Sequence, residues 1–327
     1  MIANKTIFIS ALDWGLGHAT RCVPIIKSLQ NNNTIIIGVT PLTQTIFDEE
    51  FSELQKIEVP AYNIKYSKKI PISLKLFLDA PKILNTIKKE KKVLEQLITK
   101  HKIDVVISDN RFGLHSKKVH CIFITHQLFL KTDVATKFAQ NINKNYILNF
   151  NEVWIPDEKD ELKSLSGGLS HGIHFHKNVK YIGTLSRLEK TISIEKPYDY
   201  LFLISGPEPQ QSIFANLLIK KAELSPNLKF AMVVPNSLNH TIQNIEFYSS
   251  PNAKKLSQVI EQGKKIICRS GYSTLMDLQK LKVDFKNIIL VPTPGQTEQE
   301  YLANYLSKKF GTRTINQKQL KQFNLNF

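Results

Sequence analysis

The feature that most constrains the fold is an alternation of short apolar segments with longer helical ones, which forms two series along the chain. The apolar segments of the first series cover residues 6–11, 34–39, 56–59, 103–108, 121–125, 152–155 and 179–182, and those of the second cover residues 200–204, 229–234, 266–268 and 288–291. Segments of this length without strict polar alternation are typical of strands buried on both faces, as in a parallel sheet covered by helices. The pattern therefore predicts an α/β protein.

A polar stretch at residues 183–199 separates the two series, and a length of 327 residues suits two domains. We expect two doubly wound, Rossmann-like domains, residues 1–183 and 184–327, with a cleft between them. In such sheets, ligands bind at the carboxyl ends of the strands, on loops that open a helix. The chemistry should therefore lie in the loops that follow the strands.

The composition narrows the class of protein. The net charge is +16, but only five of the 44 basic residues are arginine, which disfavours the alternative of a basic nucleic-acid-binding protein with steeply salt-dependent binding. No apolar run is long enough for a membrane span or a secretory signal, and three widely spaced cysteines form neither a disulfide framework nor a zinc site. We expect a cytoplasmic protein.

The first loop with chemical character joins residues 6–11 to a helix that is expected to begin near Ala19. Gly15 and Gly17 let the backbone approach a ligand closely, and the helix start directs N–H groups at an anion. Thr20 replaces the third glycine of a dinucleotide fingerprint, which argues against a nicotinamide enzyme. His18 lies at this helix start, where a histidine suits a catalytic base or a phosphate ligand.

Three loops of the second series have a similar character. Ser205 and Gly206 follow residues 200–204 and suit either a phosphate or a plain turn. Ser270 and Gly271 open a helix whose amides, with Ser273 and Thr274, suit a diphosphate.

The helix after Gly271 also carries Asp277, three residues beyond Thr274 and on the same face, where a carboxylate suits ribose hydroxyls. In the last of the three loops, prolines and a glycine at residues 292–295 precede polar side chains suited to sugar hydroxyls, among them Gln296, Glu298 and Gln299.

Together these segments resemble the MurG-like glycosyltransferases of the GT-B fold along nearly the whole chain. The resemblance is strongest in Cys268-Arg269-Ser270-Gly271 with Asp277, and in Val291-Pro292 with Gln299, Tyr301 and Asn304. The segment from Gly15 to His18 is similar to that family's Gly-Gly-His loop.

The resemblance implies a nucleotide-sugar donor, most often a UDP-sugar such as a UDP-hexose or a UDP-N-acetylhexosamine, and neither a metal nor another cofactor. The donor-binding residues that it implies, together with those indicated by the loops, are Gly15, Gly17, Arg187, Ser205, Gly206, Arg269, Ser270, Gly271, Tyr272, Ser273, Thr274, Asp277, Gln296, Glu298 and Gln299. Asp277 stands where the family has a longer glutamate, and the loop at Gly206 is rich in proline rather than glycine. The acceptor does not follow from the resemblance.

The mechanism is expected to be a metal-independent, in-line displacement at the anomeric carbon with inversion. The chain has no Asp-x-Asp motif, so helix N-termini and cations would stabilise the leaving diphosphate. Two residues are candidates for the base that deprotonates the acceptor hydroxyl. His18 has the suitable intrinsic pKa, and Asp109 follows residues 103–108, although pairing with Arg111 would weaken it as a base.

Residues 65–102 carry eleven lysines against Asp79, Glu90 and Glu95, with apolar side chains interleaved near residues 71–78. Such a segment suits an anionic membrane surface. It would place the enzyme at the inner face of the cytoplasmic membrane, with a lipid-linked or other glycan as acceptor. A core-packed helix with a solvated lysine face is the alternative.

A second enzymatic hypothesis is a nucleotide-sugar 2-epimerase of the same fold. That reaction needs acidic groups around the sugar, and Asp109, Asp277, Glu298 and Glu300 are candidates for them. Formation of an isomeric UDP-sugar, rather than release of UDP, would distinguish the epimerase from the transferase.

Overall fold

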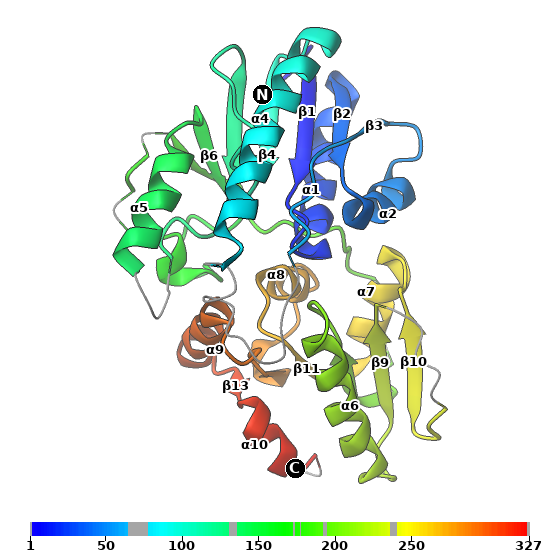
Figure 1. Ribbon diagram of the computed structural model, residues 1–327. Helices are drawn as coiled ribbons and strands as arrows, with labels where there is room; N and C mark the ends of the chain where they lie inside the picture. Colours follow the sequence, from blue (N-terminus) through cyan, green and yellow to red (C-terminus); the bar gives the residue numbers. More distant parts are fainter. Residues whose placement is uncertain are drawn as a thin grey trace. The chain divides into compact units, whose positions relative to one another are not determined.

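The computed structural model describes residues 2–64, 78–130, 136–172, 174–176, 178–191, 195–235 and 241–325. The chain divides between Arg187 and Leu188 into two compact units, each built around its own parallel sheet (Figure 1). Two parallel sheets with intervening helices confirm the predicted α/β class. Among the described residues, no helix has the length and apolarity that crossing a bilayer requires.

The N-terminal unit contains a parallel sheet whose described strands follow the order β3-β2-β1-β4-β5-β6-β7. The strands are β1 (Thr6–Ala11), β2 (Thr34–Val39), β3 (Gln55–Glu58), β4 (Val105–Asp109), β5 (His120–Ile124), β6 (Glu152–Ile155) and β7 (Val179–Tyr181). The described helices are α1 (Leu16–Leu29), α2 (Pro41–Glu50), α4 (Ala80–His101) and α5 (Thr136–Ile147), with short 3₁₀ turns at Gln30–Asn32 and Gly167–Leu169.

The two faces of this sheet bury separate apolar clusters. On one face, Ile7, Ile9 and Ile107 pack with α1 and α2, for example against Val23 and Phe47. On the other face, Phe8, Val106 and Phe123 pack with Leu94, Leu97 and Ile98 of α4. Burial on both sides explains why these strands are continuous apolar runs.

The C-terminal unit has described strands in the order β10-β9-β8-β11-β12-β13. They are β8 (Tyr198–Leu203), β9 (Phe230–Val234), β10 (Ile245–Ser249), β11 (Gly263–Cys268), β12 (Ile288–Leu290) and β13 (Arg313–Thr314). The helices are α6 (Gln210–Glu223), α7 (Ala253–Glu261), α8 (Tyr272–Lys280), α9 (Thr297–Phe310) and α10 (Gln317–Gln322), with a 3₁₀ turn at Phe285–Asn287.

In each sheet, successive strands are added on one side of the first strand and then on its other side. The chain moves outward from β1 to β3 and then returns to the other side of β1 with β4; it does the same around β8, and returns with β11. The loops after β1 and β4, and those after β8 and β11, therefore diverge and leave room for a ligand at the carboxyl ends. These positions hold His18 and Asp109 in one unit, and Gly206 and Gly271 in the other.

Some elements differ from the sequence prediction. Helix α1 begins at Leu16 rather than near Ala19, so Gly17 and His18 lie in its first turn. Strand β10 was not predicted because it is the edge strand of its sheet, and its residues are only partly buried. Helix α5, rich in Asn and Lys, and the short elements β13 and α10 were also missed.

Candidate functional site

His18 and Asp109 meet at the reversal point of the N-terminal sheet. His18 lies in the first turn of α1, and Asp109 is the last residue of the neighbouring strand β4. His18 Nδ1 is 2.7 Å from Asp109 Oδ1. The Asp109 side chain is fully buried, whereas 20% of the His18 side chain is exposed. The two residues proposed as rival bases therefore form one hydrogen-bonded pair.

Arg21, three residues after His18 on α1, completes this pair. Its side chain is 2% exposed, and its Nε and one terminal nitrogen donate hydrogen bonds to the two carboxylate oxygens of Asp109. Burial alone raises the pKa of Asp109, but the charges and hydrogen bonds of Arg21 and His18 outweigh it and lower that pKa to about 2. Asp109 is thus a permanently ionised partner of His18 and is unsuited to act as a base near neutral pH.

The surroundings of His18 favour its neutral form. Burial lowers the pKa of its imidazole, and the positive charge of Arg21 lowers it further, while the carboxylate of Asp109 acts in the opposite direction. A neutral, partly exposed imidazole whose Nδ1 faces a buried carboxylate is the arrangement that a general base requires.

His126 is a member of this cluster that sequence reasoning missed. It follows the carboxyl end of β5, the strand next to β4, and is 5% exposed. A terminal nitrogen of Arg21 lies 3.2 Å from His126 Nδ1. The available signal was the position of His126, directly after the predicted strand at residues 121–125.

Arg111, which was considered as the partner of Asp109, lies elsewhere. Its Nε is 2.8 Å from Glu90 Oε1 on α4, and its terminal nitrogens donate to the carbonyls of Ala11 and Pro60. The arginine that lowers the pKa of Asp109 is Arg21. The difference arises because Asn110 adopts a left-handed conformation, with φ of 54°, immediately before Arg111.

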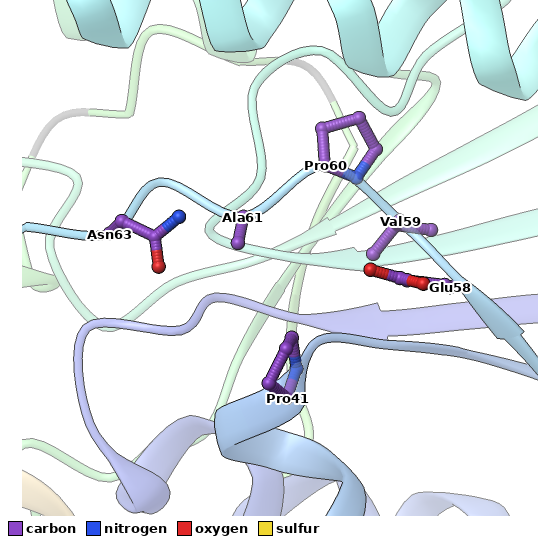
Figure 2. A pocket seen from close by; sticks show the side chains of 6 residues that line it. All are labelled: Pro41, Glu58, Val59, Pro60, Ala61 and Asn63. Atoms are coloured by element: carbon purple, nitrogen blue, oxygen red, sulfur yellow. The ribbon is translucent and has the colours of Figure 1, made fainter.

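A pocket of about 430 Å³ opens at the carboxyl ends of β2 and β3 in the same unit (Figure 2). Its lining combines apolar and hydrogen-bonding groups: Pro41, Glu58, Val59, Pro60, Ala61 and Asn63. Glu58 supplies a carboxylate and Asn63 a carboxamide. Lys82 of α4 fixes the backbone of the loop by donating to the Asn63 carbonyl at 2.7 Å. Neutral, hydroxyl-rich molecules suit such a lining.

In the C-terminal unit, three glycines at the carboxyl ends of adjacent strands border open space. A Cβ atom built at Gly206, Gly271 or Gly295 would meet no atom within 4 Å, whereas one at Gly263 would meet Leu201 at 2.9 Å. Gly206 and Gly295 have φ of 94° and 76°, which only glycine adopts readily. The backbone is therefore accessible to a ligand at these loops, as it also is at Gly15.

Helix α8 directs its N-terminus toward this accessible backbone. Gly271 is its N-cap residue and offers no side chain to cap the helix. Within the described part of the chain, the half-buried hydroxyls of Ser273 and Thr274 form no hydrogen bond, and Asp277 is half-buried one turn further on. The N-terminus of α8 and these hydroxyls suit a diphosphate.

Three of the residues predicted to bind the donor make contacts inside the protein that support the loops. The buried guanidinium of Arg269 lies over the ring of Phe214 and donates to the carbonyls of Val291 and Pro292 at 3.1 Å. Burial lowers the pKa of Arg269 to about 10. Ser270 donates to the carbonyl of Gln299 at 2.7 Å, and Tyr272 is buried.

The loop at Gly295 is braced by its own glutamines. Gln299 Oε1 accepts a hydrogen bond from the Thr293 amide at 2.9 Å, and Gln299 Nε2 donates to Gln296. Gln296, Glu298 and Gln299 are all half-buried. The side chains of the two glutamines thus hold the loop in place beside the exposed Gly295.

The remaining predicted donor residues have different surroundings. Ser205 is half-buried beside the exposed Gly206. Arg187 belongs to the N-terminal unit, where its guanidinium pairs with Glu50 at 3.1 Å and Glu49 at 3.6 Å on α2. Within the described ranges, no three His, Cys, Asp or Glu side chains are gathered as metal ligands.

Solved glycosyltransferase structures resemble the chain over nearly its full length. The spinosyn rhamnosyltransferase SpnG, complexed with thymidine diphosphate, is 12% identical with a TM-score of 0.66, over 98% of this chain and 88% of that one. MurG of Acinetobacter baumannii is 11% identical with a TM-score of 0.56, over 98% and 89%. UGT89C1 of Arabidopsis thaliana, complexed with UDP-L-rhamnose, is 10% identical with a TM-score of 0.65, over 98% and 89%. At these identities, the likeness establishes the fold alone.

Residues 222–326 match the family described as the glycosyltransferase family 28 C-terminal domain. The chain is a glycosyltransferase of the GT-B fold whose C-terminal third carries this family 28 domain. The matched region of this glycosyltransferase contains the loops at Gly271 and Gly295 and the whole of α8 and α9. The predicted family resemblance and transferase class are thus confirmed. No curated protein matches the sequence.

Proposed function

We propose that this glycosyltransferase transfers a sugar from a nucleoside diphosphate sugar to a hydroxyl group of an acceptor, without a metal ion and with inversion. The observation that carries the proposal is the His18–Asp109 pair, in which a neutral, partly exposed imidazole is backed by a buried carboxylate. The nucleotide-binding part rests on the accessible amides at Gly206, Gly271 and Gly295.

The reaction is a single displacement. The acceptor oxygen attacks the anomeric carbon, the bond from that carbon to the diphosphate oxygen breaks, and His18 Nε2 takes the hydroxyl proton. Asp109 accepts from Nδ1–H and stabilises the imidazolium that forms. The negative charge that develops on the leaving diphosphate is met by the N-terminus of α8.

The donor is proposed to be a UDP-sugar. Ser273 and Thr274 would hydrogen-bond the diphosphate, and Asp277 the ribose hydroxyls. Among the structural neighbours, SpnG is complexed with thymidine diphosphate and UGT89C1 with UDP-L-rhamnose, which makes nucleoside diphosphates the first ligands to test.

We expect UDP to raise the melting temperature of the protein, because a ligand at 100 times its dissociation constant adds about 2.7 kcal/mol of stability. Gly271→Val should weaken UDP binding at least about tenfold, since the new side chain would enter the open space beside the α8 amides, where a Cβ atom meets no protein atom within 4 Å. A thermal-shift titration with UDP, dTDP and UDP-N-acetylglucosamine measures both effects.

Lys280→Ala is the matched control, since Lys280 is exposed at the opposite end of α8. It should leave the UDP titration unchanged. If none of the three nucleotides stabilises the wild-type protein, the proposed donor class is wrong.

We infer that the pocket at Glu58 and Asn63 binds a neutral, hydroxyl-rich part of the acceptor. Glu58→Gln removes a charged hydrogen-bond acceptor, a change that costs roughly 1.5–3 kcal/mol when the bond is made. With a neutral glycoside that supports turnover, the KM of that glycoside should rise about tenfold or more while the KM of the UDP-sugar stays constant. Glu53→Gln, at an exposed position just before β3, is the control, and an equal effect of both variants would contradict the inference.

Docking of the lysine-rich segment on an anionic membrane stays a prediction. Residues 65–77 lie outside the described residues, and α4 exposes Lys88, Lys89, Lys91 and Lys92 opposite its buried face. That arrangement fits both a membrane-binding surface and a solvated one. A cytoplasmic location and a lipid-linked acceptor are likewise proposals.

A further inference from the structure

Two groups compete for one nitrogen of the proposed base. His18 Nδ1 lies 2.7 Å from Asp109 Oδ1 and 2.9 Å from a terminal nitrogen of Arg21. A carboxylate only accepts hydrogen bonds, and a guanidinium only donates them. A neutral His18 therefore satisfies one of these neighbours at a time, and the choice decides which of its nitrogens carries the proton.

The choice decides whether His18 is a base. If Nδ1–H donates to Asp109, the lone pair on Nε2 is available for the acceptor proton. If Nδ1 instead accepts from Arg21, Nε2 carries a hydrogen and cannot take another proton from the acceptor. Catalysis by His18 thus requires that Arg21 donate its hydrogen bonds to Asp109 and not to His18 Nδ1.

The geometry of Arg21 meets this requirement. Its Nε and one terminal nitrogen engage both oxygens of Asp109, and its other terminal nitrogen lies 3.2 Å from His126 Nδ1. This two-point contact fixes the plane of the carboxylate, with Oδ1 turned toward His18. Cys22, whose thiol lies 3.7 Å from Asp109 Oδ2, is the remaining ionisable neighbour.

We propose that Arg21 is a positioning residue that sets the tautomer and the basicity of His18. It orients and neutralises Asp109, so that His18 carries its proton on Nδ1 and keeps Nε2 free. Its positive charge also opposes protonation of His18 before the acceptor binds. The inference rests on the proposed function, because it assumes that His18 is the base.

The test measures His18 directly and needs neither donor nor acceptor. In protein labelled with ¹³C and ¹⁵N at histidine, long-range ¹⁵N–¹H correlation identifies the protonated nitrogen, and a pH series gives the pKa. His18→Asn assigns the signals. In the wild type we expect protonated Nδ1 and a pKa below 6.5. In Arg21→Gln we expect a higher pKa of His18 than in the wild type, because a like charge has been removed.

Arg21→Lys is the second variant in case Arg21→Gln does not fold. Lysine keeps the positive charge but cannot make the two-point contact of the guanidinium with Asp109. The two tautomers of His18 should therefore mix, and the ¹⁵N chemical shifts of its two ring nitrogens should converge. Arg111→Lys, another buried arginine of the same unit that pairs with Glu90, is the control and should leave the His18 signals unchanged. An Arg21→Gln or folded Arg21→Lys protein with the wild-type pKa and tautomer of His18 would overturn the proposal.

Activity gives an independent readout. If His18 is the base, Arg21→Gln should lower kcat about tenfold to a hundredfold with little change in the KM of the donor, since Arg21 is buried. The acid limb of the pH–rate profile should move to higher pH together with the pKa measured for His18. If Arg21→Gln changed the NMR signals of His18 but not turnover, Arg21 would still position His18, but His18 would not be the base.

Discussion

Sugar transfer by His18→Ala is expected to be slower than that of the wild type by about 10²–10⁴-fold, the usual contribution of a general base. The acceptor hydroxyl would then lose its proton to water, because the buried Asp109 is held by Arg21 and has a pKa of about 2. Steady-state release of UDP in the presence of acceptor measures the effect. UDP binding should stay at its wild-type level, since His18 is assigned to proton transfer.

The pH dependence of the transfer rate tests the same role of His18. The folded protein lowers the pKa of His18 below its ordinary value, so the base is present above that pKa and is lost as pH falls through it. The wild-type rate should therefore rise with pH to a plateau, with a midpoint below 6.5, and His18→Ala should lack this step.

His115→Ala provides a histidine control in the same unit. His115 is half-buried, and its Nδ1 lies 2.9 Å from the carbonyl of Phe112, away from Asp109. Transfer by this variant should stay within about twofold of the wild type. If His18→Ala instead retained more than a third of wild-type turnover, His18 would not be the base.

The relation between His18 and Asp109 shows where sequence reasoning stops. Each residue was identified as a candidate base from its place after a strand, but they were treated as rivals. Only the strand order, with β4 directly beside β1, shows that they are partners. A sequence of alternating strands and helices predicts the layers of such a fold, whereas the order of strands depends on long-range packing that local patterns do not encode.

The partner of Asp109 was also misjudged for a physical reason. Arg111 is two residues away in sequence, but the left-handed residue Asn110 intervenes, and Arg111 joins Glu90 instead. Arg21 is 88 residues away, yet it is three residues after His18 on α1 and so shares its face. The three-residue spacing of His18 and Arg21 on α1 therefore indicates the partner of Asp109 better than closeness in sequence does. That spacing became informative only when α1 was known to begin before His18.

In the loops predicted to bind the donor, the backbone and the side chains have different surroundings. Gly206, Gly271 and Gly295 border open space, as loops that bind a diphosphate would require. Arg269 and Ser270, next to Gly271 in sequence, are instead buried and bonded to neighbouring carbonyls. A motif places the backbone of a turn, while the direction of each side chain depends on the elements packed around it.

The largest expected effect on stability belongs to Glu90, whose side chain is fully buried on α4. Its carboxylate lies 2.8 Å from Arg111 Nε, and it accepts hydrogen bonds from the hydroxyl of Tyr62 at 2.8 Å and the amide of Gly113 at 2.9 Å. Glu90→Ala would remove the nearer of two carboxylates beside the buried Arg111 guanidinium, the other being Asp13 at 4.0 Å, and would leave two buried donors without this acceptor. We expect the free energy of unfolding of the N-terminal unit to fall by about 3–5 kcal/mol.

Tryptophan fluorescence during urea unfolding measures this loss selectively, because Trp14 and Trp154 are the two tryptophans of the chain and both belong to the N-terminal unit. Glu95→Ala is the matched control on the same helix. Glu95 pairs with the largely exposed Lys118 at 2.8 Å, a kind of surface ion pair that contributes about 0–1 kcal/mol. A fall of less than about 1 kcal/mol for Glu90→Ala would show that water or a shifted Arg111 replaces the carboxylate.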